Sequence, residues 1–92
     1  MKLKVKFLKP FSNAVGESEL ELDFNGIYLE DLLKFLIDRY PKLEKEFYNK
    51  TDELIEYTCV FVNDKPISAL DGINTELKNG DEILFFIPIS GG

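Results

Sequence analysis

Hydrophobic and polar residues alternate in two segments near the start of the chain. In "KLKVKFL", residues 2–8, Leu3, Val5 and Phe7 fall on one side and three lysines on the other. In "ELELDF", residues 19–24, the polar side carries acidic residues instead. A period of two is typical of strands with one buried face. The pattern predicts an antiparallel hairpin with lysines opposite acidic side chains, joined by a loop over residues 9–18.

The period then changes to that of a helix. In "YLEDLLKFLIDRY", residues 28–40, the apolar side chains recur on one stripe. They are Leu29, Leu32, Leu33, Leu36, Ile37 and Tyr40. Pro41 either ends this helix or begins a second one in "PKLEKEFY", whose buried side would be Leu43 and Phe47. The polar stretch Asn49–Glu56 is expected to form a surface connection.

Strand patterns return in the second half of the chain. "YTCVFVNDKPIS", residues 57–68, predicts a strand, a tight turn at Asn63–Asp64 and a short return strand. Pro66 places that return strand at a sheet edge, because proline donates no ladder hydrogen bond. We expect one helical turn over residues 75–77. "EILFFIPI", residues 82–89, is apolar on both faces, which indicates a central strand with a parallel neighbour.

This order of elements predicts an α+β fold. A hairpin followed by a crossover helix gives a mixed sheet with one main helix packed on one face. The last strand would lie centrally beside the first, which is the β-grasp (ubiquitin-like) architecture. Residues 1–92 are interpreted as a single domain, because the chain is too short for a second hydrophobic core.

Composition excludes some classes of partner. The net charge is −6 and the pI is near 4.6, so we expect no nucleic-acid partner, although plain solubility explains the charge equally well. The longest apolar run, Ile83–Ile87, is too short to span a bilayer, and the start of the chain has no signal-peptide pattern. The single cysteine cannot form an internal disulfide, so we expect the protein to be cytoplasmic.

The sequence offers little chemistry inside the domain. It has no phosphate-binding glycine loop, no histidine base or ligand, and no calcium loop. Cys59 lies in an apolar strand and is interpreted as a buried structural residue. We therefore expect no metal site, no bound cofactor and no catalytic residues of an enzyme.

The last residues, "PISGG", could act outside the domain. Strand pairing should end near Pro88, because proline donates no ladder hydrogen bond. The tail beyond the strand could extend about 16–18 Å and consists of Pro88, Ile89, Ser90, Gly91 and Gly92. Gly91 and Gly92 lack Cβ atoms and can enter a narrow channel. The carboxylate of Gly92 becomes reactive only when it is activated, for example as an acyl-adenylate, which needs ATP and a second protein. A frayed terminus is the alternative.

Four pieces of the chain, in order, carry a family resemblance: "LKVKFLKPFSNAVG", "LEDLLKFL", "VFVNDKPIS" and "NTELKNGDEILFFIPISGG". The chain resembles the MoaD/ThiS group of ubiquitin-like sulfur carriers, most of all the small subunit of molybdopterin synthase. The resemblance implies that an adenylyltransferase related to ubiquitin-activating enzymes consumes ATP to adenylate Gly92. A thiocarboxylate would follow and donate sulfur to the molybdopterin (molybdenum or tungsten cofactor) precursor. The large synthase subunit would supply the catalytic residues.

The resemblance also implies a partner-binding surface made of Leu8, Pro66 and Phe86. Packing of Phe86 in the core is an equal alternative. Other functions stay open: a protein modifier joined to target lysines through Gly92, a thiamin-type carrier, or an interaction module with an idle tail. Two residues depart from the family pattern, since Ile87 replaces a usual proline and Tyr28 replaces a usual capping threonine.

Overall fold

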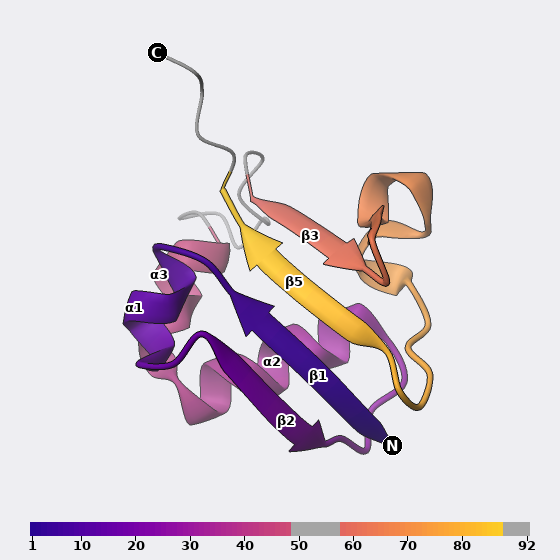
Figure 1. Ribbon diagram of the computed structural model, residues 1–92, viewed down its shortest axis with the longest axis horizontal. Helices are drawn as coiled ribbons and strands as arrows, with labels where there is room; N and C mark the ends of the chain where they lie inside the picture. Colours follow the sequence, from indigo (N-terminus) through magenta and orange to yellow (C-terminus); the bar gives the residue numbers. More distant parts are fainter. Residues whose placement is uncertain (49–57, 88–92) are drawn as a thin grey trace.

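A mixed sheet organises the chain, which a computed structural model describes over residues 1–48 and 58–87. Within these residues the sheet has five strands in the order β2-β1-β5-β3-β4. They are β1 (Lys2–Phe7), β2 (Glu19–Asp23), β3 (Cys59–Val62), β4 (Lys65–Pro66) and β5 (Glu82–Phe86). The central strand β5 runs parallel to β1 and antiparallel to β3, whereas β2 and β4 lie at the two edges (Figure 1).

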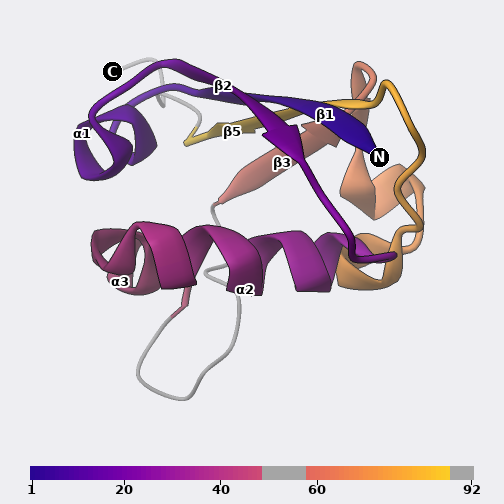
Figure 2. The same cartoon turned by 90° about the horizontal axis from the view of Figure 1, so that it is seen from below.

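The longest helix, α2 (Leu29–Arg39), and the short α3 (Glu44–Phe47) lie on one face of this sheet (Figure 2). The short helix α1 (Phe11–Val15) lies between β1 and β2 in the chain. Single 3₁₀ turns are η1 (Pro41–Leu43), η2 (Ile67–Ala69) and η3 (Gly72–Asn74). We call the sheet face opposite α2 the open face; it is the face seen in Figure 1. This arrangement confirms the predicted β-grasp fold.

The core fills the space between the sheet and α2. The predicted apolar faces of β1, β2 and α2 point into this space; most of their residues are buried, and Leu20, Ile37 and Tyr40 are half-buried. Phe7, Phe47 and Phe85 have almost no exposed surface. The ring centroids of Phe7 and Phe85 are 5.7 Å apart, and those of Phe47 and Phe85 are 5.0 Å apart. Since Leu43 and Phe47 are fully buried, the second helical segment after Pro41 packs as its pattern predicts.

Asp31 fixes the start of α2. Its carboxylate accepts hydrogen bonds from the backbone N–H groups of Tyr28 and Ile27, at 2.9 and 3.1 Å. These bonds lower the pKa of Asp31 below its ordinary value. The helix is therefore capped from its third residue, and the departure from threonine at Tyr28 is compensated.

The two predicted hairpins have the expected pairing. Lys2, Lys4 and Lys6 lie opposite Asp23, Glu21 and Glu19 in the register of β1 and β2. Asn63 and Asp64 both have positive φ, at 49° and 68°, as a two-residue β-turn of the primed type requires. Pro66 lies on the edge strand β4.

Two local predictions are wrong. The stretch 9–18 contains α1 instead of a plain loop, because Phe11 is fully buried and Gly16 ends the helix in the left-handed conformation, with φ of 87°. The helical turn expected over residues 75–77 is η3, three residues earlier. Thr75 is extended instead, and its hydroxyl donates to the carbonyl of Gly72 at 2.7 Å.

The predicted surface connection over Asn49–Glu56 lies outside the described residues. In the part of the chain that the structure describes, no helix is both long and apolar enough to cross a membrane.

Candidate functional site

The central strand β5 leads directly to the C-terminal segment. Its last ladder pair joins Phe86 to Cys59 of β3, and the N–H of Leu8 donates to the carbonyl of Phe85 at 3.0 Å. Ile87, the last described residue, is half-buried and packs against the core. The C-terminal tail lies outside the described residues, so the structure does not test the role predicted for it. The tail is Pro88, Ile89, Ser90, Gly91 and Gly92.

An apolar patch occupies the open face where β5 ends. Leu84 pairs with Phe61, Phe61 pairs with Pro66, and Phe86 pairs with Cys59, so these side chains share one face. The rings of Phe61 and Phe86 have their centroids 5.4 Å apart. Leu8 follows β1 one step beyond the pair Phe7–Phe85 and is 54% exposed. The apolar patch is therefore Leu8, Cys59, Phe61, Pro66, Leu84 and Phe86.

The structure brings the three predicted partner-binding residues into this patch. Phe86 is half-buried on the open face and does not join the buried core, whereas its neighbour Phe85 is fully buried. Pro66 belongs to the patch because it pairs with Phe61, and Leu8 belongs to it because its backbone is hydrogen-bonded to β5 at Phe85. A cluster of apolar side chains that stay partly exposed is a candidate docking surface.

Sequence reasoning missed three members of the patch. Phe61 and Leu84 alternate with the buried residues Val60, Val62, Ile83 and Phe85, but both strands are apolar on both faces, so the sequence does not say which set points outward. Cys59 follows the same parity. The prediction that Cys59 is buried is wrong, because Val60 and Val62 take the inward positions and leave Cys59 half-buried on the open face.

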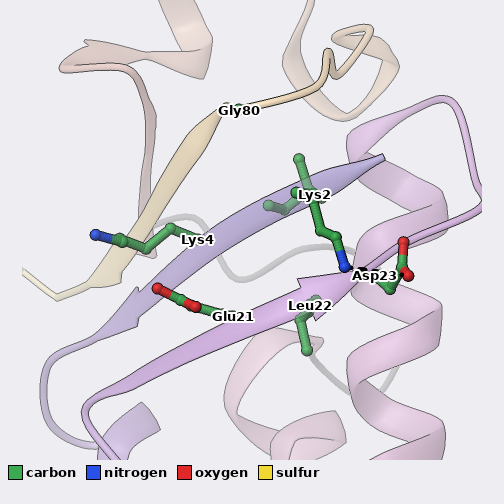
Figure 3. Close-up of a pocket in the computed structure, with 7 residues that line it drawn as sticks. Lys2, Lys4, Glu21, Leu22, Asp23 and Gly80 are labelled. Carbon is green, nitrogen blue, oxygen red and sulfur yellow. Dashed lines mark hydrogen bonds and ion pairs between the residues drawn. The ribbon is translucent and has the colours of Figure 1, made fainter.

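The rest of the open face is charged and partly paired. The ammonium of Lys6 lies 2.7 Å from the Glu82 carboxylate, and this contact raises the pKa of Lys6 and lowers that of Glu82. Lys2 lies 3.3 Å from Asp23. Both pairs are exposed, so they contribute little to stability. Figure 3 shows a hollow between β1 and β2 on this face, where the Lys2 ammonium points toward Asp23 while Glu21 lies apart from that pair.

The open face therefore has two halves. Charged side chains cover β2, β1 and the start of β5, and the apolar patch covers the end of β5 together with β3 and β4. Among residues 1–48 and 58–87, no group of three or more acidic or cysteine side chains is placed to hold a metal ion. The apolar patch lies beside Phe86, where β5 leads into the C-terminal segment, and is a candidate binding surface.

Fold and site together define a ubiquitin-like β-grasp protein. The profile of the ThiS family matches residues 5–92. The chain belongs to the ThiS family, and this confirms the resemblance drawn from the sequence. Its relatives include sulfur carriers and ubiquitin-like protein modifiers.

Three relatives illustrate this range. The molybdopterin synthase sulfur carrier subunit of Chlamydomonas reinhardtii is 30% identical over 94 residues, covering 100% of both chains. Small archaeal modifier protein 3 of Haloferax volcanii is 28% identical over 94 residues, again covering 100% of both chains. The solution structure of small archaeal modifier protein 1 from Methanosarcina acetivorans has a TM-score of 0.85 and 35% identity, covering 99% of this chain and 96% of that one.

Proposed function

We propose that this chain is a sulfur carrier whose reacting group is the carboxylate of Gly92. The observation that carries the proposal is the match to the ThiS family, which continues to residue 92 and so includes the Gly91–Gly92 ending. The chain acts as a protein cosubstrate, and the catalytic residues belong to its partners.

The chemistry needs two steps outside this chain. In the first, a carboxylate oxygen of Gly92 attacks the α-phosphorus of ATP, which forms an acyl-adenylate and releases pyrophosphate. In the second, hydrosulfide attacks the carbonyl carbon, AMP leaves with the bonding electrons, and the resulting thioacid loses its proton. The product is a thiocarboxylate at Gly92. The partner that binds and consumes the ATP is an adenylyltransferase of the ubiquitin-activating type.

Pro88, Ile89, Ser90 and Gly91 serve as the stalk that carries Gly92 into the partner. The apolar patch docks the partner at the base of that stalk, with Leu8, Pro66 and Phe86 among its contacts. Support for this role comes from the open face, where Phe86 lies two residues before Pro88 and outside the core. A partner that covers the patch removes apolar surface from water, which favours association.

The acceptor of the sulfur is proposed to be the molybdopterin precursor. Support comes from the Chlamydomonas sulfur carrier subunit, which matches the whole chain. On this route the second partner is the large subunit of molybdopterin synthase.

A protein modifier is the second candidate, because the two small archaeal modifier proteins match almost the whole chain at 28% and 35% identity. The same acyl-adenylate would then react with a lysine amine of a target protein, which forms an isopeptide bond and releases AMP. Both functions use Gly92, so they can coexist in one chain.

An activation assay tests the proposal. The chain is incubated with a ubiquitin-activating-type enzyme from the same genome, ATP and a sulfide source, and its intact mass is measured. We expect the gain of one sulfur-for-oxygen exchange, and no gain for a variant lacking Gly91 and Gly92. An unchanged mass with every such enzyme of that genome would overturn the proposal. Capture of the tagged chain from cells under denaturing conditions tests the second candidate, which predicts larger conjugates joined through Gly92.

A further inference from the structure

The edge strand β2 carries features that the proposed function does not use. It lies at the opposite side of the sheet from β3 and β4, so it is separated from the apolar patch by β1. A partner on the apolar patch therefore leaves this edge accessible.

The backbone of β2 has hydrogen-bonding groups that point away from the sheet. The N–H of Phe24 donates to Met1, and the N–H of Phe7 donates to Ser18, so the even-numbered residues of this stretch face β1. The odd-numbered residues Glu19, Glu21 and Asp23 then direct their N–H and C=O groups outward. An open row of this kind is a template for an added strand.

The charges on β2 favour a particular kind of partner strand. Glu19, Glu21 and Asp23 are exposed on the open face, and Leu20 and Leu22 point to the helix side. Asp23 pairs with Lys2, but among residues 1–48 and 58–87 no cation lies within 4.0 Å of the Glu19 or Glu21 carboxylate. An added strand places its side chains about 4.5–5.5 Å from those of its neighbour. Basic residues are therefore favoured beside the acidic row, and apolar residues beside the leucines.

The helix side of this edge is also hollowed, but cations of this chain already lie there. A hollow of about 520 Å³ lies between the end of β2 and α2, and its lining includes Asp23, Phe24, Asp31, Lys34, Phe35 and Asp38. Lys34 lines this hollow, and the Arg39 guanidinium lies 5.6 Å from the centroid of the Phe35 ring, so the preference for basic residues in the partner rests on the acidic row of the open face. The same acidic row disfavours a second copy of β2, because like charges would then lie opposite each other.

We propose that the β2 edge binds an extended segment of a partner protein in which basic and apolar side chains alternate. The segment adds a sixth strand beside β2, with its lysines or arginines next to Glu19, Glu21 and Asp23. This interaction is non-covalent and does not depend on Gly92, so it survives whether or not the proposed sulfur-carrier function holds.

Titration of the ¹⁵N-labelled full chain with a synthetic peptide tests the proposal. The probe is a peptide of about seven alternating lysine and valine residues, long enough to pair along β2. We expect chemical-shift changes centred on residues 19–23, and slower solvent exchange of the amide protons of Glu19, Glu21 and Asp23. A control peptide with the same composition, but with its lysines and valines in two blocks, should bind on the order of tenfold more weakly.

Two variants separate backbone addition from charge attraction. E21P removes one outward N–H donor without touching a bond to β1, and should abolish the exchange protection along the edge. The variant E19Q/E21Q keeps every backbone donor and should weaken binding on the order of tenfold. Circular dichroism and the core amide shifts show that each variant is folded. The proposal is overturned if both peptides bind alike, if the shifts centre on the apolar patch, or if the folded variants bind as the parent does.

Discussion

Phe86 of β5 packs against Phe61 of β3 on the open face, with the ring centroids 5.4 Å apart, while the adjacent Phe85 is fully buried on the other face. Two neighbouring phenylalanines thus have different surroundings. This difference allows the docking role of the open face to be separated from the stability of the fold.

Replacement of Phe86 by alanine should weaken binding of the activating partner by about tenfold or more, because an aromatic anchor is lost from the proposed interface. The free energy of unfolding should fall by only about 1 kcal/mol, since the side chain is half-buried. Calorimetric titration against the partner and urea unfolding measure the two effects.

The matched control is Phe85→Ala, which removes a fully buried ring and should cost about 3–5 kcal/mol of stability. If F86A binds the partner as tightly as the parent does, the apolar patch is not the docking surface.

Gly26 should tolerate no side chain. A Cβ at this position would lie 2.8 Å from the Cβ of Asp31 and would also overlap the ring of Phe24. Because Phe24 is buried and Asp31 caps α2, neither neighbour can move freely. Gly26→Ala should therefore lower the free energy of unfolding by about 1–3 kcal/mol. Urea unfolding measures the loss, and the exposed neighbour Asn25, changed to alanine, is the control that should lose less.

The Asp31 cap of α2 should make the stability of the fold depend on pH. The pKa of Asp31 is below its ordinary value of 3.8, mainly because the Tyr28 N–H and then the Ile27 N–H bind the carboxylate. The charged cap therefore stabilises the fold above that ordinary value, and its contribution is lost as the pH falls through the folded pKa.

Asp31→Asn should be less stable than the parent at neutral pH, and the difference should shrink as the pH falls below 3.8. Urea unfolding across this range measures it. A difference that stays constant with pH would show that the charge of Asp31 plays no part.

Asn63 should stabilise the β3–β4 turn with its side chain as well as its backbone. Its amide group donates to the Asp81 carboxylate at 2.8 Å and accepts from the Glu82 N–H at 3.0 Å, and this joins the turn to the start of β5. Asn63→Gly keeps the positive φ but loses both bonds, so it should cost about 1–2 kcal/mol. Asp64→Gly, at φ of 68°, loses neither bond and should be neutral or stabilising. Equal losses for both variants in thermal unfolding would assign the effect to the backbone.

Much of this fold could be predicted because its apolar pattern follows strand and helix periods closely. The faces of β1 and α2, the turn at Asn63 and the central place of β5 all follow from such local patterns. The helix α1 could not be predicted in this way, since its formation depends on burial of Phe11 against Phe47 and Phe85, which are distant in sequence. The position of η3 depends similarly on a hydroxyl of Thr75 that bonds back to Gly72.

The candidate site was predictable only in part. The parity of Leu8 with the outward lysines indicated its exposure, but Phe86 lies in a strand that is apolar on both faces, so sequence alone could not choose its face. The packing of α2 on one face of the sheet decides which side chains of β5 are buried, and it leaves Phe86 on the other face. The strand pairing shows that Phe61, Leu84 and Cys59 join the patch.

The most direct test of the central claim is the intact mass of the C-terminal peptide of the native chain, isolated from the cells that express it and protected from oxidation. We predict that a fraction of the peptide ends at Gly92 with one sulfur in place of one carboxylate oxygen, and that this fraction disappears when the activating enzyme is deleted. A peptide that carries only the ordinary carboxylate in both strains would contradict the claim.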